Sequence, residues 1–291
     1  MGAGVGDVVA AVSTALYNRR VLEILGIPVH LYGLIVGTAA VVGIELAIRR
    51  AKLAGLNADQ LWSSVWPVLV GGLIGARAWH VVTDWPLYQT QPLNALAFWQ
   101  GGLSVLGAML GGAIGLWAYS RLARSPIKLA MLLDLSVFGL PAAQAIGRWG
   151  NFVNQELYGL PSSLPWAITI DPQFRLPGFE GQSTYHPLFA YELLLTGAFG
   201  GWLWWHDRRH QLQRQRPLAV THQLIGTGSY ALLYGWYYSG VRLLLDFIRI
   251  DKTASIIPSL GTNQVVLVII WVVLGWWLYQ RRQTVALIFK T

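Results

Sequence analysis

The chain has 291 residues, of which 54% are hydrophobic and only 12% are Asp, Glu, Lys or Arg. Soluble domains carry about 25% charged residues, so this composition excludes an ordinary soluble protein and indicates a membrane protein. The net charge of +8 needs no nucleic acid, because basic loops at membrane surfaces explain it. Cysteine is absent, which excludes disulfides and a thiol nucleophile from this chain.

Seven apolar segments are long enough for membrane-spanning helices, which need about 20 residues to cross roughly 30 Å of hydrocarbon. We therefore predict an all-α, polytopic integral membrane protein that forms a single transmembrane domain over residues 1–291. A small outer-face lobe is expected around residues 147–186, and an interfacial helix in the first twenty residues. In chain order, the seven segments are Val29–Ile48, Leu61–Val82, Leu103–Tyr119, Leu129–Ile146, Pro187–Trp205, Leu224–Ile248 and Val265–Tyr279.

Basic residues between the segments predict the orientation, because cytoplasmic loops carry the excess of Lys and Arg. The N-terminus is therefore predicted outside, the C-terminus in the cytoplasm, and residues 147–186 on the outer face. Of the 21 Lys and Arg, 13 lie at one set of segment ends. They are Arg49, Arg50, Lys52, Arg121, Arg124, Lys128, Arg208, Arg209, Arg214, Arg216, Arg281, Arg282 and Lys290.

Two of the predicted spans carry ionisable stripes along one helical face. Each stripe has two interpretations: internal ion pairs that tie helices together, or a ligand site. Arginines exceed nearby acids, which favours an anionic ligand such as phosphate, because Arg binds phosphate bidentately. One stripe holds Arg77, His80 and Asp84, and the other holds Tyr238, Arg242, Asp246 and Arg249.

The segment from Gly147 to Gly159 puts an arginine, two asparagines, a glutamine and a glutamate at the end of an apolar helix. An Arg near the bilayer centre costs roughly 2.5–3.5 kcal/mol on insertion scales. A chain that keeps such a cluster is expected to bind something anionic there.

The same thirteen residues resemble the signature of the prolipoprotein diacylglyceryl transferase family. Four shorter blocks resemble other motifs of that family and occur in the family's order, so the resemblance covers about Ile27–Asp251. They are Ile27–Gly33, Gly75–Arg77, His186–Glu192 and Arg242–Arg249.

The resemblance implies transfer of the diacylglyceryl group of phosphatidylglycerol to the lipobox cysteine of a prolipoprotein, in a bacterial inner membrane. Catalytic roles are implied for Arg148, Arg242 and Tyr32. We expect no metal and no cofactor, because no His, Asp and Glu cluster has ligand spacing and arginines can neutralise the leaving phosphate. Substrate binding is implied for Arg148, Asn151, Asn154, Glu156, Gly159, Arg77, Asp246, Arg249, His186, Tyr191 and Glu192.

Structural alternatives stay open for several of these residues. Arg148 is also placed to pair with Glu156, and Tyr32 is also suited to an interfacial aromatic belt. The two asparagines of the signature are suited to capping a helix end. His186, which precedes a proline, is suited to starting a helix.

Two positions depart from the family's pattern. Many members carry a histidine where this chain has Leu106, and leucine can neither accept a proton nor donate to phosphate. Asp246 stands where the late motif usually has glutamate, and an ion pair with Arg242 at i, i+4 remains feasible. The missing histidine keeps open an alternative function, a diverged paralogue that binds phospholipid or lipoprotein without efficient transfer. Intramembrane charge alone would also suit a transporter, but the order of the motifs disfavours it.

Overall fold

The computed structural model describes residues 21–24, 27–97, 102–122, 128–213, 225–250 and 261–289. The interfacial helix expected in the first twenty residues lies outside these ranges. The chain divides into two compact units. The first combines residues 1–47, 136–219 and 229–291, and the second combines residues 48–135 and 220–228. α2 (Leu31–Leu53) is shared between the two units.

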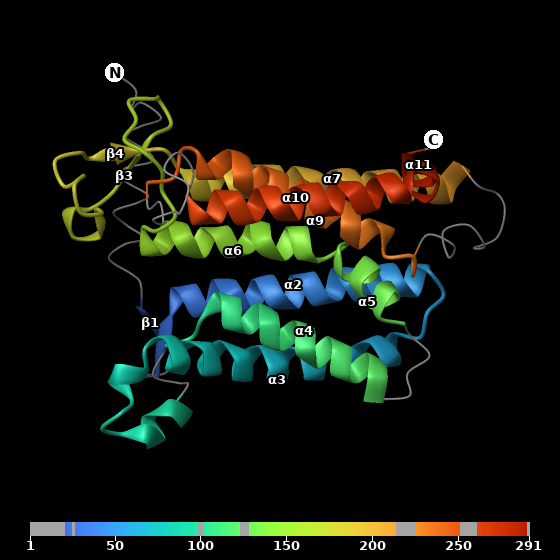
Figure 1. The fold of residues 1–291 in the computed structure, drawn as a ribbon, viewed down its shortest axis with the longest axis horizontal. Coiled ribbons are helices and arrows are strands. Elements are labelled where there is room, and N and C mark those ends of the chain that lie inside the picture. The colour runs from blue at the N-terminus through green and yellow to red at the C-terminus, as the bar shows by residue number, and fades with distance from the viewer. Residues whose placement is uncertain are drawn as a thin grey trace. The chain divides into compact units, whose positions relative to one another are not determined.

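In the first unit, long helices run along one another (Figure 1). α7 contacts both α6 and α9, and α9 contacts α10. A glycine contact joins α2 to the start of α6: a Cβ on Gly139 would lie 1.8 Å from the carbonyl oxygen of Gly43. The helices are α6 (Leu140–Asn154), α7 (Leu188–Gln213), α9 (Ser229–Asp246), α10 (Thr262–Gln280) and α11 (Arg282–Phe289), preceded by the hairpin of β1 (Val21–Ile24) and β2 (Ile27–His30).

Between α6 and α7 the chain folds into a small lobe. Its strands β3 (Ile168–Thr169) and β4 (Thr184–Tyr185) pair antiparallel, and the 3-10 turn η4 (Pro172–Phe174) lies between them. The lobe has an apolar core of its own, which is why a Gly/Pro-rich segment keeps a defined shape. That core contains Tyr158, Ile168, Ile170, Tyr185 and Phe189.

In the second unit, α3 and α4 contact each other through glycines. A Cβ on Gly111 would lie 2.0 Å from the carbonyl oxygen of Gly71, and a Cβ on Gly107 would lie 2.2 Å from that of Gly75. Small residues let helix backbones approach closely in membranes. The elements of this unit are α3 (Ala58–Thr83), η1 (Trp85–Leu87), η2 (Pro92–Leu96), α4 (Val105–Leu122) and α5 (Leu129–Ser136).

The all-α, polytopic membrane fold is confirmed. Three helices of the described chain are long and apolar enough to cross a membrane, Leu31–Leu53, Leu61–Thr83 and Asn263–Gln280. α5 and α6 together provide a fourth candidate. α4, α7 and α9 form as helices where spans were expected, and the total of seven spans stays a prediction.

Candidate functional site

A buried glutamate lies at the centre of a polar cluster in the first unit. Glu192 of α7 is fully buried, and its Oε1 accepts hydrogen bonds from Arg148 and from the Tyr238 hydroxyl, the latter at 2.7 Å. Its Oε2 accepts from Arg242 Nη1 at 2.7 Å. Three helices therefore converge on one carboxylate.

The cluster forms because polar residues repeat on one face of α6 and on one face of α9. On α6, Gln144, Arg148 and Asn151 stand at i, i+4 and i+7, which is helical spacing. On α9, Tyr238 lies one turn from Tyr234, whose hydroxyl donates to Gln144 Oε1. The two polar stripes thus meet each other and the glutamate of α7.

The charges of this cluster do not cancel, because two guanidinium groups share one carboxylate. Arg148 Nε is also buried and makes no hydrogen bond within the described residues. Within these ion pairs, two guanidinium groups therefore face a single carboxylate.

The ion pairs that the sequence suggested for Arg148 and Arg242 are not the ones that form. Across the described part of the chain, Arg148 pairs with Glu192 and not with Glu156. Arg242 likewise pairs with Glu192, while Asp246 is buried at the end of α9 without pairing to Arg242.

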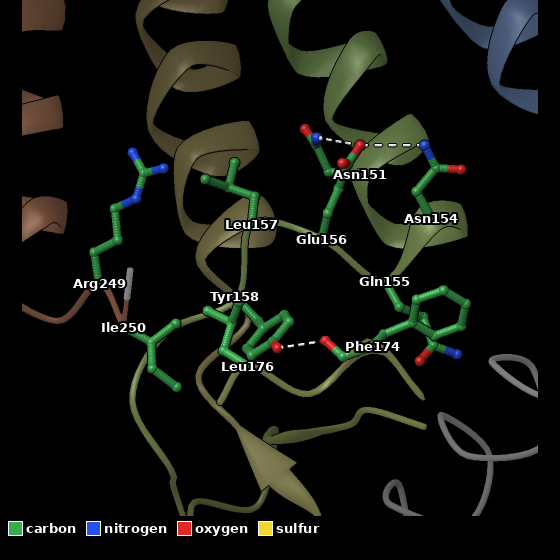
Figure 2. A pocket seen from close by; sticks show the side chains of 10 residues that line it. All are labelled: Asn151, Asn154, Gln155, Glu156, Leu157, Tyr158, Phe174, Leu176, Arg249 and Ile250. Carbon is green, nitrogen blue, oxygen red and sulfur yellow. Dashed lines mark hydrogen bonds between the residues drawn. The ribbon is translucent and has the colours of Figure 1, made fainter. Parts of the chain in front are cut away.

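The two asparagines of the signature connect this cluster to Glu156. Asn151 Oδ1 accepts from Arg148 Nη1 at 3.0 Å, and Asn151 Nδ2 donates to Glu156 Oε1 at 3.1 Å. Asn154 Nδ2 donates to the same oxygen at 3.2 Å, as Figure 2 shows. The asparagines thus orient charged groups, whereas the cap of α6 is made by backbone hydrogen bonds.

An open cavity of about 640 Å³ adjoins these residues. In the view of Figure 2, Arg249 lies across the cavity from Asn154, with Glu156 between them. Carboxylate, amide and guanidinium groups therefore face one space large enough for a small polar headgroup. The lining residues are Asn151, Asn154, Gln155, Glu156, Leu157, Tyr158, Phe174, Leu176, Arg249 and Ile250.

Two glycines of the segment Gly147–Gly159 are required because other parts of the chain lie directly against their backbone. A Cβ on Gly150 would lie 2.8 Å from the ring of Tyr32, so this ring packs directly on the helix backbone. A Cβ on Gly159 would lie 2.6 Å from the carbonyl oxygen of Ile248. The N–H of Gly159 donates to the carbonyl of His186 at 2.8 Å, so this position joins three chain segments.

These observations agree with comparisons to known proteins. The prolipoprotein diacylglyceryl transferase profile matches residues 19–280. The chain belongs to that family. It is 35% identical to the phosphatidylglycerol–prolipoprotein diacylglyceryl transferase of Chloroflexus aggregans, over 79% of this chain and 76% of the relative. The enzyme of the same name from Gloeobacter violaceus is 33% identical over 90% and 93%. That from Frankia alni is 36% identical over 84% of this chain, which spans 61% of that relative's length.

Within the family's signature, sequence reasoning missed the role of Gln155. Its backbone is left-handed, with φ of 54°, and its side chain is buried. The side chain amide donates to Asp171 Oδ2 at 2.9 Å and accepts from the Asp171 N–H at 2.7 Å. Gln155 therefore fastens the lobe to the end of α6. A long polar residue next to two asparagines was the available signal.

In the segment His186–Glu192, the adjacent side chains of Tyr191 and Glu192 contact different partners. Tyr191 accepts a hydrogen bond from Trp166 Nε1 at 2.8 Å, and its hydroxyl lies 3.1 Å from His186 Nδ1. Glu192, the next residue, enters the arginine cluster instead. His186 lies two residues before α7, as expected for a residue that starts a helix.

Arg77 of the second unit is held by backbone carbonyls. Its guanidinium donates to Asn94, Ala95 and Gly102 at 2.5, 2.9 and 3.1 Å. Arg77 thereby fastens the η2 segment. The pairing of His80 with Asp84, one of those considered for this stripe, is confirmed at 3.0 Å.

Proposed function

We propose that this protein transfers the diacylglyceryl group of phosphatidylglycerol to the lipobox cysteine of a prolipoprotein. The observation that carries the proposal is the pair of guanidinium groups sharing one buried carboxylate next to an open polar cavity. Buried charges normally pair off, so a surplus cation is suited to an anionic ligand, and the lipid supplies a phosphate.

The reaction needs positive charge beside one atom, the phosphate oxygen that leaves. The thiolate of the cysteine attacks C3 of the lipid's diacylglyceryl moiety, and an S–C bond forms as the C–O bond to phosphate breaks. The electron pair leaves with the phosphate oxygen, which departs as glycerol phosphate, and the thiol proton passes to a base or to solvent. Fixed cations beside that oxygen stabilise the transition state more than the ground state.

We assign roles from the contacts. Arg148 and Arg242 supply the positive field, and Arg249 in the cavity wall binds phosphate. The network of Asn151, Asn154 and Glu156 binds the glycerol hydroxyls. Tyr32 packs on Gly150 of the same helix as Arg148 and hydrogen-bonds to lipid.

The next role to assign is that of the group that accepts the thiol proton, because Leu106 stands where many relatives carry histidine. Leu106 lies in the first turn of α4. If that position takes the proton, Leu106→His raises transferase activity above that of the natural chain. Unchanged or reduced thioether formation would count against a proton-transfer role for this position.

The decisive experiment incubates purified protein with phosphatidylglycerol and a lipobox peptide, then detects diacylglyceryl adduct and glycerol phosphate by mass spectrometry. Arg148→Ala is expected to reduce the rate by about 10²–10³-fold, as loss of one stabilising donor does. The matched control is Arg209→Ala, because Arg209 is exposed and stacks on Trp205 towards the other end of α7. Lipid binding without adduct would instead support the non-transferring paralogue.

We also propose a bacterial inner-membrane location with the N-terminus outside and the C-terminus cytoplasmic. The support is the excess of basic residues at one set of segment ends. Reporter fusions at the two termini test this: periplasmic phosphatase activity is expected only at the N-terminus, and the reverse pattern would contradict it.

A further inference from the structure

A turn of the lobe carries apolar side chains that the core of the lobe does not bury. Leu164 and Trp166 are 38% and 53% exposed, and Pro165 between them is exposed as well. Leu176 and Phe179, by contrast, pack against the buried core of the lobe. We call residues 164–166 the apolar turn. None of these three residues lines the cavity of about 640 Å³, so the apolar turn is not part of the candidate site.

Hydrogen bonds hold the apolar turn in one shape. The Leu164 N–H donates to Ser162 Oγ at 3.2 Å, and the Ala167 N–H donates to the Leu164 carbonyl at 2.9 Å. The indole N–H of Trp166 donates to the Tyr191 hydroxyl at 2.8 Å. The polar atom of the indole therefore has its partner within the protein, and the part of the ring that stays exposed is apolar.

The contact with Tyr191 places the apolar turn at the level where the helices meet the lobe. The candidate span formed by α5 and α6 ends at Asn154. Phe152 in the last turn of α6 and Phe189 in the first turn of α7 have ring centroids 5.2 Å apart, so these two helix ends lie side by side. Tyr191 lies two residues further along α7, which is about 3 Å of helix. The apolar turn is therefore close to the membrane surface on the lobe's side.

Tyr191 is also the first member of an exposed apolar stripe on α7. Leu194, Ala198 and Trp205 follow it at helical spacing and are exposed, Leu194 at 64% and Trp205 at 50%. Glu192, one residue after Tyr191, lies on another face of the helix and is buried. A contiguous exposed apolar surface on a membrane protein marks contact with lipid. The stripe therefore faces the hydrocarbon.

Aromatic side chains stand at both ends of this stripe. At the end remote from the lobe, the Arg209 guanidinium lies 4.2 Å from the ring centroid of Trp205, and aromatic and basic residues are typical anchors at a bilayer surface. At the lobe's end, Trp166 bonds Tyr191. Tyr191 and Trp205 are about 21 Å apart along the helix, and the indole of Trp166 extends this length towards the roughly 30 Å of a hydrocarbon core.

We propose that the apolar turn inserts into the membrane surface on the lobe's side and that Leu164 and Trp166 anchor the lobe to lipid. The partner is the boundary between headgroups and acyl chains, because the turn continues a stripe that faces lipid. The lobe supplies Phe174 and Leu176 to the wall of the candidate site, so the anchor holds that wall at the depth of phospholipid headgroups. The inference depends on the membrane fold and not on the transfer reaction.

Because the chain has no cysteine, one labelled position can report the depth of the turn. Leu164→Cys is labelled with the fluorophore NBD, and the full protein is reconstituted into vesicles of phosphatidylglycerol and phosphatidylcholine. The emission is expected to be shifted to the blue, to be quenched by lipids that carry a nitroxide near the headgroup, and to be unaffected by iodide on both sides of the membrane.

Gly181→Cys is the matched control for this label. Gly181 lies on the same lobe between the exposed residues Glu180 and Gln182, and a Cβ there would meet nothing within 4 Å. Its label is expected to be quenched by iodide and not by the nitroxide lipids. A label on residue 164 that behaves like this control overturns the proposal.

Substitution of Trp166 tests the anchor itself. In the Leu164→Cys protein, Trp166→Asp puts a charge into the turn and is expected to bring the label into water, where iodide quenches it. Trp166→Phe keeps an apolar ring and is expected to leave the label in lipid. Equal quenching of the two variants overturns the role of Trp166.

The same label distinguishes lipid from the other partner that an apolar turn could bind, a peptide. If the turn binds the prolipoprotein, nitroxide lipids will not quench the label, and a lipobox peptide will shield it from iodide, which overturns the proposal. The measurement requires no transfer of lipid. A label buried in lipid, on a protein that forms no diacylglyceryl adduct, therefore supports the anchor and refutes the transferase function alone.

Discussion

Two helix contacts in this molecule are formed by different kinds of residue, glycines in one and charged or polar side chains in the other. α3 and α4 meet at glycines, with backbone lying directly against backbone. α6, α7 and α9 meet at two arginines, a glutamate and several tyrosines and amides. Small residues are the inexpensive way to join helices in lipid, whereas intramembrane charge costs several kcal/mol. The glycine contact shows that this chain can join two helices without charged residues. The charged contact between α6, α7 and α9 is therefore better explained by a chemical role than by helix packing.

The largest expected effect comes from removing the shared carboxylate. Glu192→Leu leaves two partly buried guanidinium groups without their partner; loss of one partner of a fully buried pair costs about 3–5 kcal/mol, and solvent around the arginines makes this the upper bound. Thermal unfolding in detergent measures the loss, and transferase activity is expected to disappear. Glu192→Gln is the matched control, because it keeps the shape and the acceptor for Tyr238. A stable Leu variant would mean that the charges are not held by Glu192.

The next largest effect is expected from a substitution that disrupts the glycine contact between α3 and α4. Gly111→Val forces a side chain against the Gly71 carbonyl, and overpacking of this kind costs about 1–3 kcal/mol. Unfolding temperature should fall, while the activity of the fraction that remains folded stays close to normal. Gly112→Val is the control, because a Cβ there would make an ordinary 3.6 Å contact. Equal destabilisation by the two variants would contradict the close packing at Gly111.

A smaller effect is expected where the lobe meets the cluster. Gln155→Leu leaves the Asp171 carboxylate and N–H without their partner, which costs about 1–3 kcal/mol. Limited proteolysis should cut the lobe between residues 160 and 185 faster, and activity should fall by about tenfold. Gln155→Glu can still accept from the Asp171 N–H, but it sets a second carboxylate against Asp171 Oδ2, so it should be at least as destabilising as the Leu variant.

The smallest effect is expected at the exposed pair of the second unit. Asp84→Asn removes the ion pair with His80, and partly exposed pairs contribute about 0–1 kcal/mol. Unfolding temperature and activity should both stay within experimental scatter. A large loss of activity would give that stripe a role beyond the structure of α3.

Much of the helical order was readable from the sequence, because apolar runs of spanning length and the Gly–Pro-rich lobe are local signals. One predicted span is interrupted, since α5 ends at Ser136 and α6 begins at Leu140 with Pro141 in its first turn. Proline lacks the N–H needed in a helix interior and favours a helix start. The sequence contained this signal at Gly139 and Pro141.

The partners within the site were less readable. Spacing at i, i+4 suggested Asp246 for Arg242, and proximity along the chain suggested Glu156 for Arg148. The structure instead uses Glu192, which is 44 and 50 residues from the two arginines. Spacing rules describe one helix at a time, whereas the choice of partner depends on how α6, α7 and α9 pack together.

The junction at Gly159 also limits where the chain can change its length. Two successive N–H groups bind two distant segments there: Gly159 bonds His186, and Leu160 bonds Ile248. An inserted residue just before them would shift both alignments at once and would turn Gln155 or Glu156 away from their partners. The tip of the lobe around Gly178, where a side chain would meet open space, has no such double alignment. Insertions should therefore be accepted at that tip and rejected between Asn154 and Leu160.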